Sequence, residues 1–375
     1  MTQLIRAIID THALRSNLRQ IRARAPDSRV MAVVKANAYG HGLNIVAPVA
    51  AESADWLGVN SLDEALSIRD LGVQKPVAIL GYTELERLAS VVTNGFRQVV
   101  YRLDTAAALS RAAAENHKPA YVHLKIETGT QRQGITLDQL PDFVREIRSL
   151  PNLEIEGAYT HFANIEDTLD PSFAQMQLQR FRSALDILDS AGIRPTQVHA
   201  AATAGALLYP ETGFTMIRLG IGTYGIWPSR ETQLAARERG RKVTLNPALT
   251  WKTRVAQVKT IPAGEYVGYG LTYQARRAMK AIVTPLGYYD GYDRKLSNSG
   301  RALVHGQSAP VIGRVAMNMT MFDVTDSGAQ PDDEVVLIGR QGQSEIRAEE
   351  VAEKTGTIAY EVVSRINPLI PRVKV

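Results

Sequence analysis

Eight short β-rich runs alternate with helical segments between about residues 30 and 225, and this alternation constrains the fold more than any other feature of the chain. The runs are mostly apolar, as expected of strands that helices cover. Eight buried strands separated by helices predict a (β/α)8 barrel, with an open doubly wound sheet as the alternative. No GxGxxG motif follows any run, which favours the barrel. The expected strands are residues 30–35, 56–59, 77–80, 97–101, 121–126, 154–161, 197–201 and 214–218.

The pattern changes after residue 230. A charged segment, residues 229–242, reads as a linker, and strand-like runs with Gly, Pro and Asn turns follow it, with one late helix near residues 347–356. We therefore expect a barrel domain over residues 1–230 and an all-β domain over residues 231–375. The first few residues are free to pair with the β-domain.

The composition excludes several classes of function. The chain has 375 residues and no cysteine, so disulfides, thiolate catalysis and sulfur-ligated metals are ruled out, and we expect no metal site. The net charge of +5 comes from scattered basic residues, which indicates a small anionic ligand rather than nucleic acid. No apolar stretch is long enough to span a membrane, and the N-terminal segment lacks the features of a signal peptide. We expect a cytoplasmic protein with no membrane partner.

Lys35 ends the first run, within the segment AVVKANAYGHG (residues 32–42). A buried ammonium is costly, and an isolated lysine here is expected to extend out of the strand end into solvent. Catalytic groups of such barrels, however, lie at the C-terminal ends of the strands. His161 and Arg218 end the sixth and eighth runs, so the same rim collects three cationic or titratable groups.

Small residues follow the last two runs. Thr203 comes after the seventh, and Gly220, Ile221 and Gly222 follow the eighth. Glycine allows backbone N–H groups to approach an anion, and loops after strands 7 and 8 of these barrels often bind phosphate. A phosphate site beside a desolvated lysine indicates a phosphorylated cofactor whose carbonyl the lysine holds as a Schiff base. Pyridoxal phosphate fits this description.

The segment AVVKANAYGHG closely resembles the cofactor-lysine segment of alanine racemases, and the resemblance runs almost from end to end. It implies a barrel that binds pyridoxal phosphate, a C-terminal β-domain, and a homodimer with active sites shared between subunits. The further motifs in family order are THFAN (160–164), IRLGIGTYG (217–225), VGYGLTY (267–273), GYYDGY (287–292), GRVAM (313–317) and TIAYEV (357–362).

The resemblance gives two residues the role of catalytic base. Lys35 matches the Schiff-base lysine, and Tyr269 matches an opposing tyrosine that the partner subunit supplies. Racemisation needs a proton donor on one face of a planar carbanion and an acceptor on the other, so two bases make chemical sense. Tyrosine ionises near pH 10 and needs cationic help to act as a base, which His161 and Arg218 match in the family. Arg218 also matches the arginine that faces the pyridine nitrogen and keeps it unprotonated.

The remaining site residues follow from the same motifs. The resemblance implies phosphate contacts through side chains and through two backbone N–H groups, and substrate contacts near the carboxylate and the entrance. The phosphate group comprises Tyr39, Thr203, Tyr360 and the backbone of Gly220 and Ile221, and the substrate group comprises Arg132, Tyr288 and the backbone of Met317.

Lys125 raises a question of charge. Strand alternation puts His123, Lys125 and Glu127 on the same side of the fifth run, and Arg132 follows shortly after. Two cations in a low-dielectric site repel unless an anion intervenes. Glu127 is one candidate for that anion. The other comes from the resemblance, since the lysine matching Lys125 is often carbamylated in the family, and we favour this reading.

The resemblance predicts an alanine racemase that supplies D-alanine for peptidoglycan, but several positions depart from the family pattern. They leave a broader racemase, acting on serine or basic amino acids, as an alternative. A barrel-type decarboxylase is less favoured because its family uses an acid at the position of Arg218 and a catalytic cysteine. A non-catalytic cofactor-binding protein would lack the β-domain and Tyr269. The departures are Glu127, Thr130, Gln133, Ala202, Asn318 and Leu369.

Overall fold

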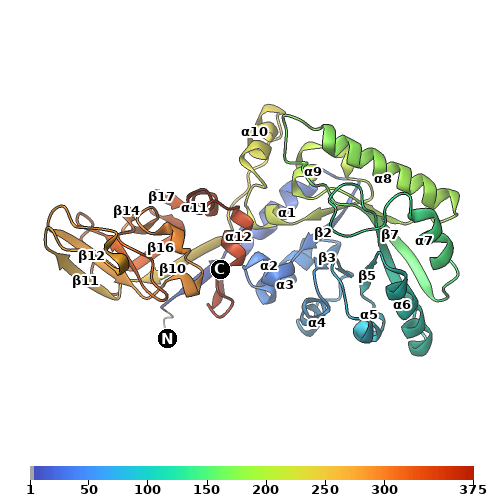
Figure 1. The fold of residues 1–375 in the computed structure, drawn as a ribbon, viewed down its shortest axis with the longest axis horizontal. Coiled ribbons are helices and arrows are strands. Elements are labelled where there is room, and N and C mark those ends of the chain that lie inside the picture. Colours follow the sequence, from blue (N-terminus) through green and yellow to red (C-terminus); the bar gives the residue numbers. More distant parts are fainter. Residues whose placement is uncertain (1–3) are drawn as a thin grey trace. The chain divides into compact units, whose positions relative to one another are not determined.

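A computed structural model describes residues 4–375, which divide into two compact units (Figure 1). The barrel unit contains residues 14–36 and 46–245. The β unit contains the described residues up to 13 together with residues 37–45 and 246–375. Within residues 4–375, no helix combines the length and apolar character that a membrane crossing requires.

The barrel unit is built on eight parallel strands that close on themselves in chain order, which confirms the (β/α)8 prediction and excludes the open sheet. Most strand residues are buried, and helices such as α4 to α8 lie outside the strands (Figure 1). The strands are β2 (Arg29–Val33), β3 (Trp56–Val59), β4 (Val77–Ile79), β5 (Arg97–Val100), β6 (Ala120–Lys125), β7 (Leu153–Tyr159), β8 (Gln197–His199) and β9 (Met216–Leu219). The helices of this region are α1 (Thr11–Arg22), α2 (Lys35–Tyr39), α3 (Leu43–Ser53), α4 (Leu62–Asp70), α5 (Leu88–Thr93), α6 (Leu103–Asn116), α7 (Leu140–Ile147), α8 (Ser172–Ser190), α9 (Thr203–Leu208) and α10 (Arg230–Glu238).

The first barrel strand ends earlier than the sequence predicted. β2 stops at Val33, and Lys35 begins α2, a single turn whose residues 36–39 all have φ between 52° and 55°. These are left-handed values, which cost about 1–2 kcal/mol per non-glycine residue. The strand prediction was wrong here because Ala and Tyr carry no signal for a left-handed turn, and the tendency of the single residue Asn37 toward this conformation is weak.

Hydrogen bonds from outside the turn compensate part of this strain. The Ala36 N–H donates to Glu64 Oε1 at 2.6 Å, and the Leu43 N–H donates to Asn37 Oδ1 at 2.8 Å. Glu64 also accepts from the backbone of Ser61 in the capping box that begins α4. One carboxylate therefore fixes both the start of α4 and the residue after Lys35.

Residues 229–242 were expected to form a linker, but they contain helix α10. Ser229 caps the helix by accepting a hydrogen bond from the Thr232 N–H at 3.0 Å. Ala235 and Ala236 are buried. A capping serine and two small apolar residues at adjacent positions are enough to dock a short helix, and the many charges of the segment hid this pattern.

The β unit contains two sheets. The larger has the order β14-β13-β16-β10-β1-β18, with β17 paired to β16, and it joins the N-terminal strand β1 to the last strand β18. The smaller has the order β11-β12-β15. The strands are β1 (Arg6–Ile9), β10 (Leu249–Arg254), β11 (Gln257–Ile261), β12 (Met279–Thr284), β13 (Arg301–Val304), β14 (Gln307–Pro310), β15 (Thr320–Asp323), β16 (Glu334–Gln341), β17 (Ser344–Ile346) and β18 (Arg372–Lys374), and the late helices are α11 (Ala348–Thr355) and α12 (Ala359–Ser364).

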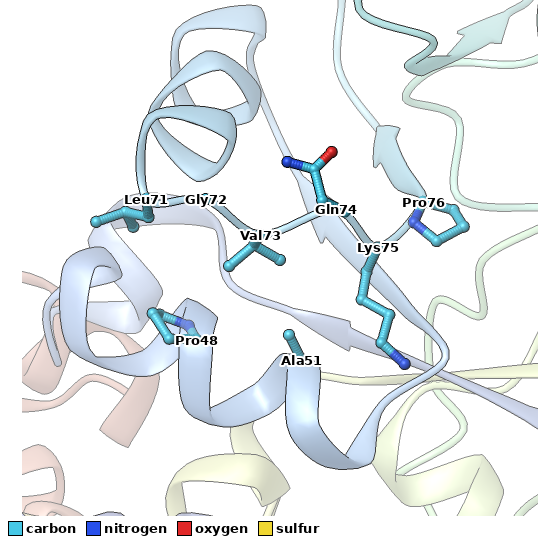
Figure 2. A pocket seen from close by; sticks show the side chains of 8 residues that line it. All are labelled: Pro48, Ala51, Leu71, Gly72, Val73, Gln74, Lys75 and Pro76. Atoms are coloured by element: carbon cyan, nitrogen blue, oxygen red, sulfur yellow. The ribbon is translucent and has the colours of Figure 1, made fainter.

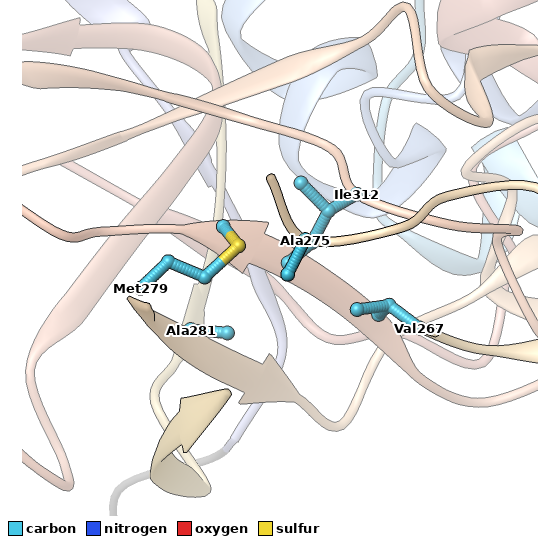
Figure 3. Close-up of a cluster of buried hydrophobic side chains, with 5 residues drawn as sticks. All are labelled: Val267, Ala275, Met279, Ala281 and Ile312. Atoms are coloured by element: carbon cyan, nitrogen blue, oxygen red, sulfur yellow. The ribbon is translucent and has the colours of Figure 1, made fainter. Parts of the chain in front are cut away.

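A small apolar cluster beside the smaller sheet holds the loops of the β unit (Figure 3). Met279 and Ala281 come from β12, and Ile312 comes from the chain just after β14. Val267 and Ala275 come from the two ends of the loop that carries Tyr269, so the cluster fixes the base of that loop. The full cluster is Val267, Ala275, Met279, Ala281 and Ile312.

Candidate active site

Arg218 lies on β9 and is the best-anchored side chain of the barrel rim. Its guanidinium is 4% exposed. One nitrogen, Nη1, donates to His199 Nδ1 at 2.9 Å and to the His199 carbonyl at 3.1 Å. The other, Nη2, donates to the carbonyls of Thr160 and Ala200, each at 2.9 Å, and to His161 Nδ1 at 3.1 Å. Acceptors at the ends of two neighbouring strands, β7 and β8, therefore fix the guanidinium in one orientation.

Tyr159 separates the cations of the rim. It lies at the end of β7. The strand register pairs it with Lys125 on β6 on one side and with His199 on β8 on the other. Its ring stacks on His199 with centroids 4.7 Å apart. Lys125 Nζ and the Arg218 guanidinium carbon lie 5.0 and 5.2 Å from the ring centroid. These are cation–π distances, so the ring stabilises two positive charges that would otherwise only repel.

His161 lies among four cationic side chains. Burial and the charges around it lower the pKa of His161 well below its ordinary value, so the ring is neutral. The charges belong, in order of effect, to Arg218, Lys125, Arg132 and Lys35. The structure thus brings together five of the residues that the sequence predicted at the site.

Lys35 is half-buried at the head of the left-handed turn. Burial lowers the pKa of Lys35, and the nearby charges of Arg132 and Arg218 lower it further. The charge of Glu64 acts in the opposite direction and raises it. A lowered pKa increases the fraction of neutral amine, which is the form that attacks a carbonyl.

Lys125 is 1% exposed, and its ammonium donates to the Ile126 carbonyl at 3.0 Å. Burial, followed by the charge of Arg218, lowers the pKa of Lys125 to about 7. The carboxylate of Glu127 accepts from the Gly129 N–H at 2.5 Å and from the backbone N–H of Arg132 at 3.4 Å. Glu127 thus shapes the loop through backbone contacts, rather than through the Arg132 guanidinium.

Thr203 and Gly222 join the segments that follow β8 and β9. Thr203 is 2% exposed at the start of α9, and its hydroxyl accepts from the Gly222 N–H at 3.4 Å. A Cβ on Gly222 would lie 2.5 Å from Thr203 Cγ2, so only glycine permits this approach. Gly220 and Ile221 lie on the turn that leads into this contact.

The predicted site residues of the β unit form three groups. Tyr39 and Tyr360 lie with ring centroids 6.2 Å apart. Tyr288 and Met317 come together because the Tyr288 N–H donates to the Ala316 carbonyl at 3.0 Å. Tyr269 belongs to a third segment, the loop between Val267 and Ala275.

Tyr269 lies at the tip of its loop and is 74% exposed. Gly268 and Gly270 flank it with φ of 74° and 73°, values that glycine adopts without strain. The loop therefore presents the tyrosine outward on a tight, defined turn.

Comparison with known proteins places this geometry in a family. Residues 9–228 match the family model "Alanine racemase, N-terminal domain", and residues 248–374 match "Alanine racemase, C-terminal domain". The chain belongs to the alanine racemase family. The predicted family is thereby confirmed.

Individual alanine racemases agree with this assignment. The chain is 40% identical to alanine racemase from Symbiobacterium thermophilum over 98% of this chain and 96% of that protein. It superposes on alanine racemase from the D-cycloserine-producing Streptomyces lavendulae with a TM-score of 0.94 and 34% identity, covering 100% of this chain and 98% of the other. It also superposes on histidine racemase from Leuconostoc mesenteroides with a TM-score of 0.89 and 28% identity, covering 100% and 98%.

Sequence reasoning missed two residues at this alanine racemase rim, Tyr159 and His199. Each ends a strand next to a predicted site residue, and that position was the available signal. Neither lies in a distinctive motif, so only the closed barrel shows that both contact Arg218.

The surface hollow in Figure 2 is separate from the alanine racemase site. It lies between α3 and the loop that follows α4, and none of the predicted site residues lines it. Its lining residues are Pro48, Ala51, Leu71, Gly72, Val73, Gln74, Lys75 and Pro76.

Proposed function

We propose that this protein is an amino-acid racemase that depends on pyridoxal phosphate and acts preferentially on alanine. The observation that carries the proposal is the environment of Arg218. A permanent cation is fixed at the barrel rim by at least five neutral acceptors, beside a lysine of lowered pKa. Such a cation holds a pyridine nitrogen unprotonated, which suits simple proton transfer.

The residues present fit the cofactor. The Lys35 amine would attach it, and Thr203 with the backbone of Gly220 and Ile221 would hold its phosphate. The missing Cβ of Gly222 supports this role, because it brings the Thr203 hydroxyl and the adjacent backbone into contact. When bound, pyridoxal phosphate supplies an electron sink that stabilises a carbanion at the substrate α-carbon. Tyr39 and Tyr360 are proposed as further phosphate contacts.

Proton transfer is assigned to Lys35 and Tyr269, one on each face of the substrate. The hydrogen bond that Arg218 donates to His161 supports the role of Tyr269 as a base. Because a guanidinium only donates, His161 Nδ1 must accept, and the neutral ring then carries its proton on Nε2. That N–H is the donor that a tyrosinate needs beside it.

A homodimer with shared sites is part of the proposal. Tyr269 is 74% exposed, and neighbouring loops of the β unit expose further large apolar side chains, a pattern typical of a surface that a partner covers. A second copy of this chain is the proposed partner. The exposed side chains nearest in sequence are Tyr266, Leu271, Tyr288, Tyr289, Met317 and Met319. We also retain a cytoplasmic location, a D-alanine supply role and a domain division near residue 230 as proposals.

Lys125 is proposed to be carbamylated. A pKa of about 7 leaves much of the amine neutral, and the neutral amine adds to carbon dioxide, forming an N–C bond and releasing one proton. The resulting anion would lie beside Arg132, which is proposed with Tyr288 and Met317 to contact the substrate. Glu127 raises the pKa of Lys125 through its charge, but its carboxylate is hydrogen-bonded to the Gly129 and Arg132 backbone and to the Thr130 hydroxyl, which supports a separate anion beside the Arg132 side chain.

A broader racemase is the second candidate. The loop after Lys125 departs from the family pattern at Thr130 and Gln133, and the structural likeness extends to a histidine racemase. A decarboxylase is not proposed, since Arg218 and the lack of cysteine do not match one.

Initial rates of racemisation across a panel of amino acids test the proposal. Alanine is expected to have the highest kcat/KM. A higher value for serine, lysine, arginine or histidine would contradict the alanine preference, and no racemisation by the loaded enzyme would refute the proposed function.

A further inference from the structure

A chain of buried polar side chains runs from Arg218 down the barrel interior, and the proposed reaction does not use it. His199 Nε2 lies 2.9 Å from His123 Nδ1. His123 Nε2 lies 3.4 Å from Glu156 Oε2. Glu156 is paired with Arg97 at 2.8 Å. With the 2.9 Å contact between Arg218 and His199, the chain links the rim to the start of strands β5 and β7.

The hydrogen bonds in this chain have one possible direction. Arg218 only donates, so His199 Nδ1 accepts and neutral His199 carries its proton on Nε2. That proton is donated to His123 Nδ1, which leaves the His123 proton on Nε2. The carboxylate of Glu156, which only accepts when ionised, then receives it. A proton on both nitrogens of either ring would place two donors face to face.

The fold makes room for these rings at specific positions. A Cβ on Gly157 would lie 2.4 Å from His123 Cγ, so the imidazole occupies the space that a side chain would take. The pairing of β6 with β7 shifts register between Val122 and His123, and Glu156 is the extra residue. Strict alternation would put Glu156 on the face opposite Gly157, and the bulge re-aims it toward His123.

Burial and ring packing hold the two histidines rigidly. Both are 0% exposed. Trp56 packs on His123 with centroids 5.5 Å apart, and Tyr159 stacks on His199 at 4.7 Å. Burial is the largest cause that lowers the pKa of each imidazole, which agrees with two neutral rings.

We propose that His199, His123 and Glu156 are positioning residues that act through Arg218. They hold the guanidinium in one fixed orientation at the rim where we propose that the cofactor ring nitrogen binds, an inference that rests on the proposed function. Glu156, anchored by Arg97, fixes the far end and so fixes which nitrogen of each imidazole carries the proton. Arg218 itself remains the group that touches the cofactor.

Nitrogen NMR of the holoenzyme with 15N-labelled histidine tests the chain directly. We expect His199 and His123 to be neutral, with the proton on Nε2, across the pH range in which the enzyme is stable. Loss of each signal in His199→Gln and His123→Gln provides the assignment. A proton on Nδ1 of either ring, or a doubly protonated ring near neutral pH, would overturn the proposal. This result does not depend on which reaction the protein catalyses.

Two substitutions of His199 test whether this residue positions Arg218. His199→Phe keeps a ring but removes the acceptor and the donor, whereas His199→Gln keeps one of each. We expect about a tenfold or greater loss of kcat in the Phe variant with little change in KM, because hydrogen bonds to charged groups are among the strong ones. The Gln variant should recover most of that loss.

The 15N chemical shift of the ring nitrogen in labelled pyridoxal phosphate distinguishes a positioning role of His199 from general damage to the structure. We expect the ring nitrogen to move toward its protonated position in His199→Phe and to stay near the wild-type position in His199→Gln, at matched Tm. An unmoved signal and an unchanged kcat in the Phe variant would refute the proposal. If His199→Phe does not fold, the same comparison is made with His123→Phe and His123→Gln. A wild-type enzyme that racemises no amino acid would instead refute the proposed function.

Discussion

Replacing Ala36 by glycine is expected to stabilise the protein, although the same change within an ordinary helix destabilises it. Ala36 has φ of 55° and an exposed side chain, so glycine removes left-handed strain without removing buried contacts. The strain is about 1–2 kcal/mol, and the extra freedom of glycine in the unfolded chain costs about 0.5–1 kcal/mol. The net gain is therefore about 0.5–1 kcal/mol. The 2.6 Å hydrogen bond from the Ala36 N–H to Glu64 is unaffected, because it uses the backbone.

Ala114 supplies the matched control, since it is exposed, lies in the same unit and belongs to the right-handed helix α6. Ala114→Gly should cost about 0.5–1 kcal/mol. For a unit of this size the two variants should shift Tm by about 1–4 °C in opposite directions. Both are compared with wild type by calorimetry at one protein and cofactor concentration. Equal losses of Tm in the two variants would show that the turn is unstrained and would refute the reasoning.

Three further predictions concern the proposed bases and Lys125. Lys35→Ala should purify without the visible absorbance of bound cofactor and without racemase activity; near wild-type activity would place the attachment lysine elsewhere. Tyr269→Phe should abolish exchange of the α-hydrogen of L-alanine with solvent deuterium and largely spare exchange from D-alanine, and mixing it with Lys35→Ala should restore some activity through hybrid dimers. Equal loss on both enantiomers, or no recovery despite subunit exchange, would argue against two shared bases. Lys125→Ala should lose most activity and regain part with added short carboxylates, whereas Glu127→Gln should matter much less. Because only the neutral amine reacts with carbon dioxide, carbamylation should rise as pH increases through about 7, measured as added mass on the native protein; an unmodified mass at every pH would refute it.

The barrel could be predicted because its strands are buried on both faces, which leaves short apolar runs in the sequence. The end of β2 could not, because the left-handed turn depends on a hydrogen bond that the distant Glu64 accepts from Ala36 and on one that Asn37 accepts from Leu43. Helix α10 was missed for a related reason: its buried residues are only Thr232, Ala235 and Ala236, none of which is large and apolar. Local patterns thus predicted elements that carry a strong apolar signal, and failed where a distant partner decides the conformation.

The candidate site also contains residues that the sequence could place and contacts that it could not. Lys35, His161 and Arg218 could be placed at one rim because strand ends of a barrel meet there. The contacts of Arg218 with His199, and of His199 with His123, join three different strands, and no spacing within one strand predicts them. The space for His123 depends on Gly157 and on a register shift, which are properties of paired strands.

The pairing of β1 between β10 and β18 has a consequence for synthesis of the protein. β1 is made long before its partners β10 and β18, and its pairing is completed only after residues 372–374 leave the ribosome. The Thr11 N–H donates to the Val375 carbonyl at 3.0 Å, and the Val375 N–H donates to the Ile9 carbonyl at 2.9 Å. Residues 246–375 expressed alone would lack the strand that joins β10 to β18 in their own sheet. A circular permutant that joins residue 375 to residue 1 and opens the chain in the exposed turn near Gly240 would make this sheet from one continuous segment, so the sheet would be able to form before the barrel is synthesised.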